Sequence, residues 1–204
     1  MVEVRLFVKV CGVTRPEDVI TAARAGADAF GIVVGFPNSP RNLPVAAARD
    51  LVRKAPEDIS PILVLNGSDL RFAEEACSII EPYGVQLYGT NDPDPVRAIG
   101  VKMVIRPVTP DELSVPDGFD AVLLDQSRGT GRALDVEVCA RYVRSSRLPV
   151  IVAGGLNPTN VADVVRRMRP FGVDASSGLE SSPGVKDPLK VTEFVRRARE
   201  AHEG

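Results

Sequence analysis

Eight short apolar runs recur along this chain, and segments with a helical spacing of apolar residues separate them. The runs are Phe7–Cys11, Asp28–Val33, Pro61–Asn66, Gly84–Leu87, Val101–Arg106, Phe119–Leu124, Pro149–Ala153 and Gly172–Ala175. Strict alternation of strands and helices favours parallel pairing of the strands. We therefore predict an α/β fold, a compact (β/α)8 or TIM barrel with one closed sheet of eight parallel strands. An open doubly wound sheet is the structural alternative.

Proline and capping residues indicate where the helices between these strands begin. The start signals are Arg15-Pro16, Pro44, Ser68-Asp69, Asn157-Pro158 and Asp187-Pro188. The weakest helical patterns fall in residues 91–95 and 107–118, which are rich in proline and aspartate. With 204 residues, each strand and helix unit has about 25 residues, which is short for a barrel but sufficient with tight loops. We see no domain boundary and expect residues 1–204 to form a single catalytic domain.

Composition narrows the classes of partner. The chain carries 25 Lys and Arg against 27 Asp and Glu, mixed along its length, for a net charge of −2. It therefore has no basic stripe for nucleic acid or for a membrane surface, and a small molecule is the expected partner. The absence of a long apolar run and of a signal-peptide pattern predicts a cytoplasmic protein. The sequence leaves open whether it is a monomer or a homodimer.

Two glycine-rich turns follow the last two predicted strands. One contains Gly154-Gly155 and the other Ser177-Gly178. Glycine lets backbone N–H groups approach an anion that a Cβ atom would hold away. Because the last two strands of a barrel are neighbours, we predict that the two turns share one phosphate-binding site.

Cys11 and Asp125 each end a predicted strand, at the face of the barrel where catalytic groups usually lie. A thiol and a carboxyl group placed there could act as a general base and a general acid. The alternatives are a small core residue for Cys11 and a helix cap for Asp125. Cys77 and Cys139 fall in helical segments, and we expect them to be packing residues.

Further charged side chains are expected at or below the same mouth. Arg41, in the loop after the second strand, could hold a substrate carboxylate, or it could be an ordinary surface arginine. Lys9 lies two residues before Cys11 and shares its face of the strand, so we expect it to point into the barrel and to pair with Asp174. The single histidine, His202, is expected to be exposed near the end of the chain, and no cluster of metal-ligand type is present.

Taken together and in order, several motifs resemble those of the phosphoribosylanthranilate isomerases. They are Lys9-Val10-Cys11-Gly12, Ser39-Pro40-Arg41, Leu123-Leu124-Asp125, Gly129-Thr130-Gly131-Arg132, Ala153-Gly154-Gly155-Leu156-Asn157-Pro158, Asp174-Ala175-Ser176-Ser177-Gly178-Leu179-Glu180 and Pro183-Gly184-Val185-Lys186-Asp187-Pro188. The resemblance implies a (β/α)8 barrel. It also implies an Amadori rearrangement of N-(5-phosphoribosyl)anthranilate in tryptophan biosynthesis, without a cofactor or a metal.

The resemblance also implies roles for individual residues. Cys11 would be the general base and Asp125 the general acid, with the pKa of Cys11 lowered from its usual value of about 8.5. Arg41 would bind the anthranilate carboxylate. Backbone groups of the two glycine turns would bind the phosphate, namely Gly154, Gly155, Ser177 and Gly178, together with Gly131.

Two positions depart from the family pattern. Tyr88 stands where the family usually has histidine, and Leu134-Asp135-Val136 replaces a segment with aromatic residues on both sides of the aspartate. Because Cys11, Asp125 and Arg41 are all present, these departures are expected to vary the walls of the site and not to remove the reaction. Two other functions are the alternatives: another sugar-phosphate isomerase or epimerase on the same barrel, and a binding module for phosphate ligands without catalytic activity. A substrate without a carboxylate would leave Arg41 nothing to hold, and a phosphate binder needs neither Cys11 nor Asp125.

Overall fold

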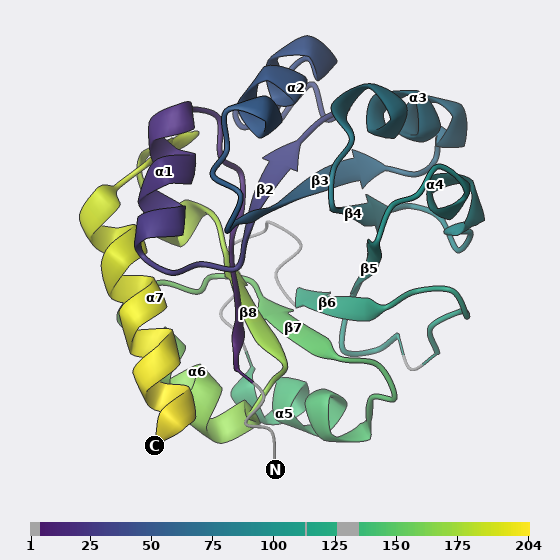
Figure 1. The fold of residues 1–204 in the computed structure, drawn as a ribbon. Coiled ribbons are helices and arrows are strands. Elements are labelled where there is room, and N and C mark those ends of the chain that lie inside the picture. Colours follow the sequence, from purple (N-terminus) through teal and green to yellow (C-terminus); the bar gives the residue numbers. More distant parts are fainter. Residues whose placement is uncertain (1–4, 113, 126–134) are drawn as a thin grey trace.

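The computed structural model describes residues 5–112, 114–125 and 135–204. Eight parallel strands close into a barrel in chain order, and the eighth pairs with the first (Figure 1). The strands are β1 (Phe7–Val10), β2 (Ala29–Val33), β3 (Ser60–Asn66), β4 (Gly84–Tyr88), β5 (Met103–Val108), β6 (Ala121–Asp125), β7 (Val150–Ala153) and β8 (Gly172–Ala175). The predicted closed barrel is confirmed, and the alternative of an open sheet is wrong.

Helices surround the barrel on its outer face (Figure 1). They are α1 (Pro16–Arg24), α2 (Val45–Arg53), α3 (Leu70–Ile80), α4 (Asp94–Ala98), α5 (Val136–Ser145), α6 (Val161–Met168) and α7 (Pro188–Glu203). The Asp69 carboxylate accepts a hydrogen bond from the backbone N–H of Phe72, and Asp187 caps α7 in the same way. Since α7 continues through Glu203, His202 is half-buried in a helical turn, and the expectation that it is exposed is wrong.

The connection from β5 to β6 departs from strict alternation. Its described residues, 109–112 and 114–120, contain no helix. Pro110 and Pro116 lack the N–H group that a helix interior needs, and Gly118 has a φ of +90°. The short helix α4 is tied to this connection instead, because Arg97 donates to the carbonyl of Gly118 and to the carboxylate of Asp120.

The barrel interior changes in character along its axis. A cluster of buried apolar side chains fills much of it: Ala29, Ile62, Ile105, Ala121, Leu123, Ile151 and Ala153. On β1, β4 and β8 the inward positions are instead polar, with Lys9, Gln86 and Asp174 all buried. The apolar cluster supplies the rigid base, and the polar residues lie beneath the mouth of the barrel.

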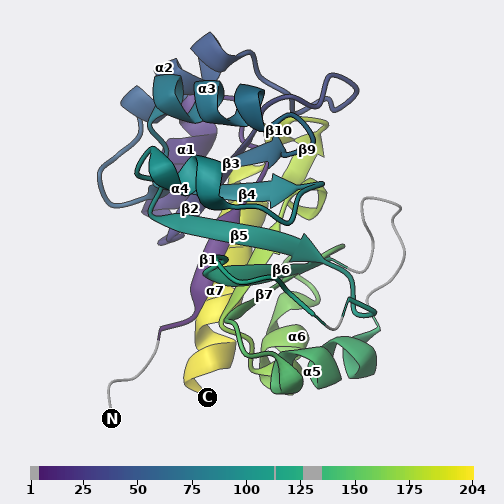
Figure 2. The ribbon, with the colours of Figure 1, turned by 90° about the vertical axis from the view of Figure 1, so that its right-hand side faces the viewer.

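An additional hairpin separates β8 from α7. It begins with a 3₁₀ turn over Ser177–Leu179 and continues with β9 (Glu180–Ser182) and β10 (Val185–Lys186). Figure 2 shows this hairpin at the end of the barrel toward which the strands run. It thereby brings Glu180 and Lys186 to the mouth. Within the described residues, none of the helices has the length and apolar character needed to cross a membrane.

Candidate active site

A cavity of about 690 Å³ opens at the carboxyl ends of the strands. It is lined by every predicted site residue that the structure describes: Cys11, Arg41, Asp125, Gly154, Gly155, Ser177 and Gly178. Gly131, the remaining predicted phosphate-binding residue, lies outside the described residues. One cavity therefore brings together residues that are up to 167 positions apart in the sequence, because the parallel strands all end at one face of the barrel.

Cys11 follows β1 directly, and its backbone N–H donates to the carbonyl of Ala175. The thiol lies over Gly31 of β2, where a Cβ atom would come within 2.6 Å of the sulfur and 3.1 Å of the Lys9 ammonium nitrogen. Glycine at this position therefore makes room for both groups. Burial raises the pKa of the Cys11 thiol, and the opposing effect of Lys9 does not cancel it. The expectation of a lowered pKa is therefore wrong.

We predict that the rate of alkylation of Cys11 by iodoacetamide continues to rise above pH 8.5, which is about the usual pKa of a thiol. The thiolate is the reactive form, and a raised pKa means that it appears only as the pH rises through that higher value. Cys77 and Cys139 are buried in helices, with pKa values raised to about 12 and about 11, and they provide internal controls. Mass spectrometry of the Cys11 peptide would give the rate at each pH. A plateau near neutral pH would contradict the prediction.

Lys9 is buried in the barrel directly below Cys11. Its ammonium group donates to Asp174 at 3.1 Å and to the side-chain oxygen of Gln86 at 3.0 Å. The predicted pair of Lys9 and Asp174 is confirmed. Burial alone would lower the pKa of Lys9, but Asp174 and Cys11 raise it above its usual value. Lys9 is therefore a permanent positive charge beside the thiol.

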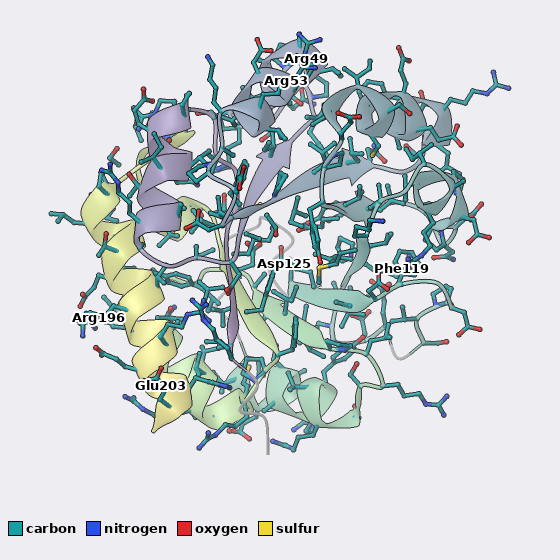
Figure 3. All side chains as sticks on the ribbon, in the orientation of Figure 1. Arg49, Arg53, Phe119, Asp125, Arg196 and Glu203 are labelled. Carbon is teal, nitrogen blue, oxygen red and sulfur yellow. The ribbon has the colours of Figure 1, made fainter. Side chains whose placement is uncertain are left out.

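Asp125 is the last residue of β6, and Figure 3 shows its side chain inside the ring of strands. Its neighbour in the sheet is Ala153, the residue that precedes the first glycine turn. Tyr88, at the end of β4, lies near both proposed catalytic groups: burial raises its pKa first, and the charges of Cys11 and Asp125 raise it further. The carboxyl group, the thiol and the phenol therefore line the same cavity.

Arg41 is held in place at the mouth by the hairpin. Its Nε and Nη2 atoms each donate to Glu180 at 2.7 Å, and Lys186 donates to the same carboxylate at 2.9 Å. The interpretation of Arg41 as an ordinary surface arginine is therefore wrong. Within the described residues its Nη1 atom makes no hydrogen bond, so one edge of the guanidinium is available to a ligand. Glu180 and Lys186 occur in the quoted motifs, but their spacing alone does not reveal this contact.

The two glycine turns touch each other closely. Gly154 and Gly155 have φ angles of +94° and +70°, and residues other than glycine rarely adopt such angles. A Cβ atom on Gly178 would lie 2.1 Å from the carbonyl oxygen of Leu156 in the other turn. Only glycine therefore permits the two loops to approach each other as they do.

We predict that Gly178→Ala raises KM about tenfold and lowers stability by about 1 to 3 kcal/mol, because the added methyl group forces the two turns apart. Gly100→Ala is the control, since a Cβ atom there meets nothing within 4 Å, although its positive φ also lowers stability. Competition by inorganic phosphate and thermal denaturation would separate the two effects. Unchanged phosphate affinity in Gly178→Ala would contradict a phosphate site between the turns.

Within the described residues, no group of three or more His, Cys, Asp and Glu side chains is arranged to hold a metal ion. The available chemistry is a thiol, a carboxyl group and a phenol on the wall of the cavity. The two glycine turns and Arg41 line the same cavity.

Comparison with known proteins identifies the family. The family model described as N-(5'-phosphoribosyl)anthranilate (PRA) isomerase matches residues 8–197. The N-(5'-phosphoribosyl)anthranilate isomerase of Methanoregula boonei is 39% identical over 97% of this chain and 98% of its own length. The enzyme of the same name from Methanopyrus kandleri is 37% identical over 94% of this chain and 98% of its own length.

Solved structures that resemble this protein belong to the same family. A phosphoribosyl anthranilate isomerase in complex with reduced 1-(o-carboxyphenylamino)-1-deoxyribulose 5-phosphate is 30% identical, with a TM-score of 0.82 over 96% of this chain and 99% of that one. The isomerase of Thermotoga maritima is 29% identical, with a TM-score of 0.84 and the same coverage. The chain belongs to the N-(5'-phosphoribosyl)anthranilate isomerase family.

Proposed function

We propose that this protein converts N-(5'-phosphoribosyl)anthranilate to 1-(2-carboxyphenylamino)-1-deoxyribulose 5-phosphate in tryptophan biosynthesis, and that Cys11 and Asp125 carry the reaction. The observation that supports this most is that they line one cavity together with the glycine turns and Arg41. That set of groups suits a substrate that carries a phosphate, a carboxylate and a reacting sugar. The ligand bound to one related structure, reduced 1-(o-carboxyphenylamino)-1-deoxyribulose 5-phosphate, likewise carries a carboxylate and a phosphate.

Asp125 acts first, as the general acid. Its proton goes to the furanose ring oxygen while the bond from that oxygen to C1 breaks, and the anthranilate nitrogen forms a double bond to C1. The product of this step is a ring-opened Schiff base. Asp125 is suited to the role because it ends β6, where the strand backbone holds the carboxyl group at the mouth.

Cys11 acts second, as the general base. Its thiolate removes the proton from C2, and the electrons of that bond form the C1–C2 double bond while those of the C1–N double bond return to nitrogen. The resulting enolamine tautomerises to the ketone. Lys9 favours the thiolate, because a buried positive charge next to the sulfur opposes the effect of burial on its pKa.

The two ends of the substrate are bound by different means. Gly154, Gly155, Ser177 and Gly178 offer backbone N–H groups to the phosphate, and Gly131 is proposed to join them. Arg41 offers its remaining edge to the anthranilate carboxylate, with Glu180 holding the other edge. All of these residues come from one chain of 204 residues acting as one catalytic domain, so a monomer and a homodimer would contain the same site.

Addition of the purified protein to N-(5'-phosphoribosyl)anthranilate tests the proposal, with the loss of substrate fluorescence as the measurement. We expect rapid loss, and we expect Arg41→Met to raise KM for this substrate while its affinity for inorganic phosphate stays unchanged. A folded protein that leaves the substrate intact would contradict the function. Equal turnover of an aminoribosyl phosphate that lacks the carboxylate would favour the alternative of a different sugar-phosphate isomerase.

A further inference from the structure

A chain of hydrogen bonds crosses the inside of the barrel from β8 to β4. It runs from Asp174 to Lys9 at 3.1 Å, from Lys9 to the Gln86 oxygen at 3.0 Å, and from the Gln86 nitrogen to the Tyr88 hydroxyl oxygen at 3.0 Å. Lys9 and Gln86 are almost completely buried. Beyond the effect of Lys9 on the Cys11 thiolate, the proposed reaction assigns no role to this chain of hydrogen bonds.

The direction of each hydrogen bond follows from the chemistry of its first donor. A lysine ammonium group can donate but cannot accept, so the Gln86 atom that faces Lys9 must be the amide oxygen. The NH2 group of that amide then faces Tyr88, and an NH2 group can only donate. The phenolic oxygen of Tyr88 is therefore an acceptor toward Gln86. Its own hydrogen must point elsewhere.

The surroundings of Tyr88 direct that hydrogen into the cavity. Tyr88 lines the cavity wall, and its ring is held edge-on against Phe36 with centroids 5.9 Å apart. Burial, followed by the charges of Cys11 and Asp125, raises its pKa, so the phenol remains neutral and keeps its hydrogen at physiological pH. The result is an uncharged hydrogen-bond donor beside the two proposed catalytic groups.

The position of this donor matches one part of the substrate. The phosphate is expected at the glycine turns and the carboxylate at Arg41, so the sugar that joins them would bind inside the cavity that Tyr88 also lines. A neutral donor suits a hydroxyl oxygen, whereas the anionic groups at the ends of the substrate call for cations or multiple N–H groups. Histidine, which the family resemblance places at this position, is likewise a side chain that can donate a hydrogen bond.

We propose that Tyr88 binds a hydroxyl group of the substrate's ribose by donating from its phenolic O–H, and that Lys9 and Gln86 are positioning residues that keep this O–H pointed into the cavity. The proposal rests on the proposed function for the identity of the substrate. It also makes a prediction for ribose 5-phosphate, which carries the sugar hydroxyls and the phosphate but no anthranilate.

Tyr88→Phe removes only the hydroxyl and keeps the ring against Phe36. We expect kcat/KM to fall about tenfold or more, the typical effect of losing one buried hydrogen bond to the substrate. Tyr88→His retains a donor and is expected to recover most of the activity. Affinity for inorganic phosphate should be the same in all three proteins. Wild-type kinetics in Tyr88→Phe would overturn the proposal.

Gln86→Glu tests the positioning role. A carboxylate still accepts from Lys9, but it also accepts from Tyr88, so the phenolic hydrogen turns away from the cavity. We expect the same loss as in Tyr88→Phe, and no further loss in the double variant, because both changes remove one interaction. Independent, additive losses would show that Gln86 acts by a route other than Tyr88 and would overturn its positioning role.

Binding of ribose 5-phosphate separates this proposal from the proposed function. Calorimetry with ribose 5-phosphate and with inorganic phosphate needs no turnover. We expect the wild type to prefer ribose 5-phosphate, and Tyr88→Phe to lose about tenfold of that preference. If the wild type did not convert the full substrate, but Tyr88→Phe still lost this preference for ribose 5-phosphate, the proposed function would fail and the role of Tyr88 would stand. Equal preference in both proteins would overturn the role of Tyr88.

Discussion

Replacement of Cys11 by serine is expected to lower kcat by about three orders of magnitude while KM changes only a few-fold. Serine is close to cysteine in shape and leaves the backbone hydrogen bond to Ala175 in place. Its hydroxyl, however, does not ionise in the accessible pH range, and the charge of Lys9 is insufficient to change that. Fluorescence decay at saturating substrate would measure kcat, and competition by inorganic phosphate would show whether the site still binds ligands.

The other two cysteines are matched controls for this substitution. Cys77 lies in α3 and Cys139 in α5, and both are buried in the core outside the cavity. Cys77→Ser and Cys139→Ser should retain kcat, and Cys77→Ser should lower the melting temperature because it places a hydroxyl group among buried apolar side chains. If Cys11→Ser kept more than a tenth of the wild-type kcat, Cys11 would not be the base.

Asp125→Asn is expected to produce a loss of similar size, about three orders of magnitude in kcat. Asparagine keeps the shape and the hydrogen-bonding ability of the side chain but has no acidic proton for the ring oxygen. Ring opening then depends on water, so the Schiff base forms slowly and the proton at C2 is not reached. Stopped-flow observation of the fluorescence decay would measure this step.

Asp120 provides the matched control, because it precedes β6 at the opposite end of the strand. Its carboxylate accepts from Arg97 and from the backbone N–H of Val104, and it lies far from the mouth. Asp120→Asn should therefore reduce stability and leave kcat close to the wild-type value. A similar loss of kcat in both variants would mean that the effect of Asp125→Asn is structural, and it would remove Asp125 from the mechanism.

Much of the fold could be predicted from local patterns. Each strand is a short apolar run, and a proline or a capping residue marks the start of α1, α2, α3 and α7. The pairing of Lys9 with Asp174, 165 residues apart, was also predictable, since closure places the eighth strand beside the first and both side chains point inward. Local propensity was less informative between β5 and β6, where prolines interrupt any helix.

The site was predictable in its members but not in its contacts. The motifs indicated Cys11, Asp125, Arg41 and the two glycine turns. They did not reveal that Glu180 holds Arg41 across 139 positions, or that Gln86 joins Lys9 to Tyr88 across 77. The direction of the pKa shift of Cys11 was also missed, because burial depends on every strand around the thiol.

The sequence alone determined the order of strands and helices and most of the residues at the ends of the strands, whereas the pairing of β8 with β1, which closes the barrel, was decided by the tertiary structure. Alternation of apolar runs and the exposure of parallel strand ends at one face impose the features that the sequence determined, and both are local or topological. The tertiary structure also decided which donor meets which acceptor, how deeply the thiol is buried and where the phenolic hydrogen of Tyr88 points. These depend on distances of a few ångströms between side chains from different strands, and such distances arise only when the closed barrel packs.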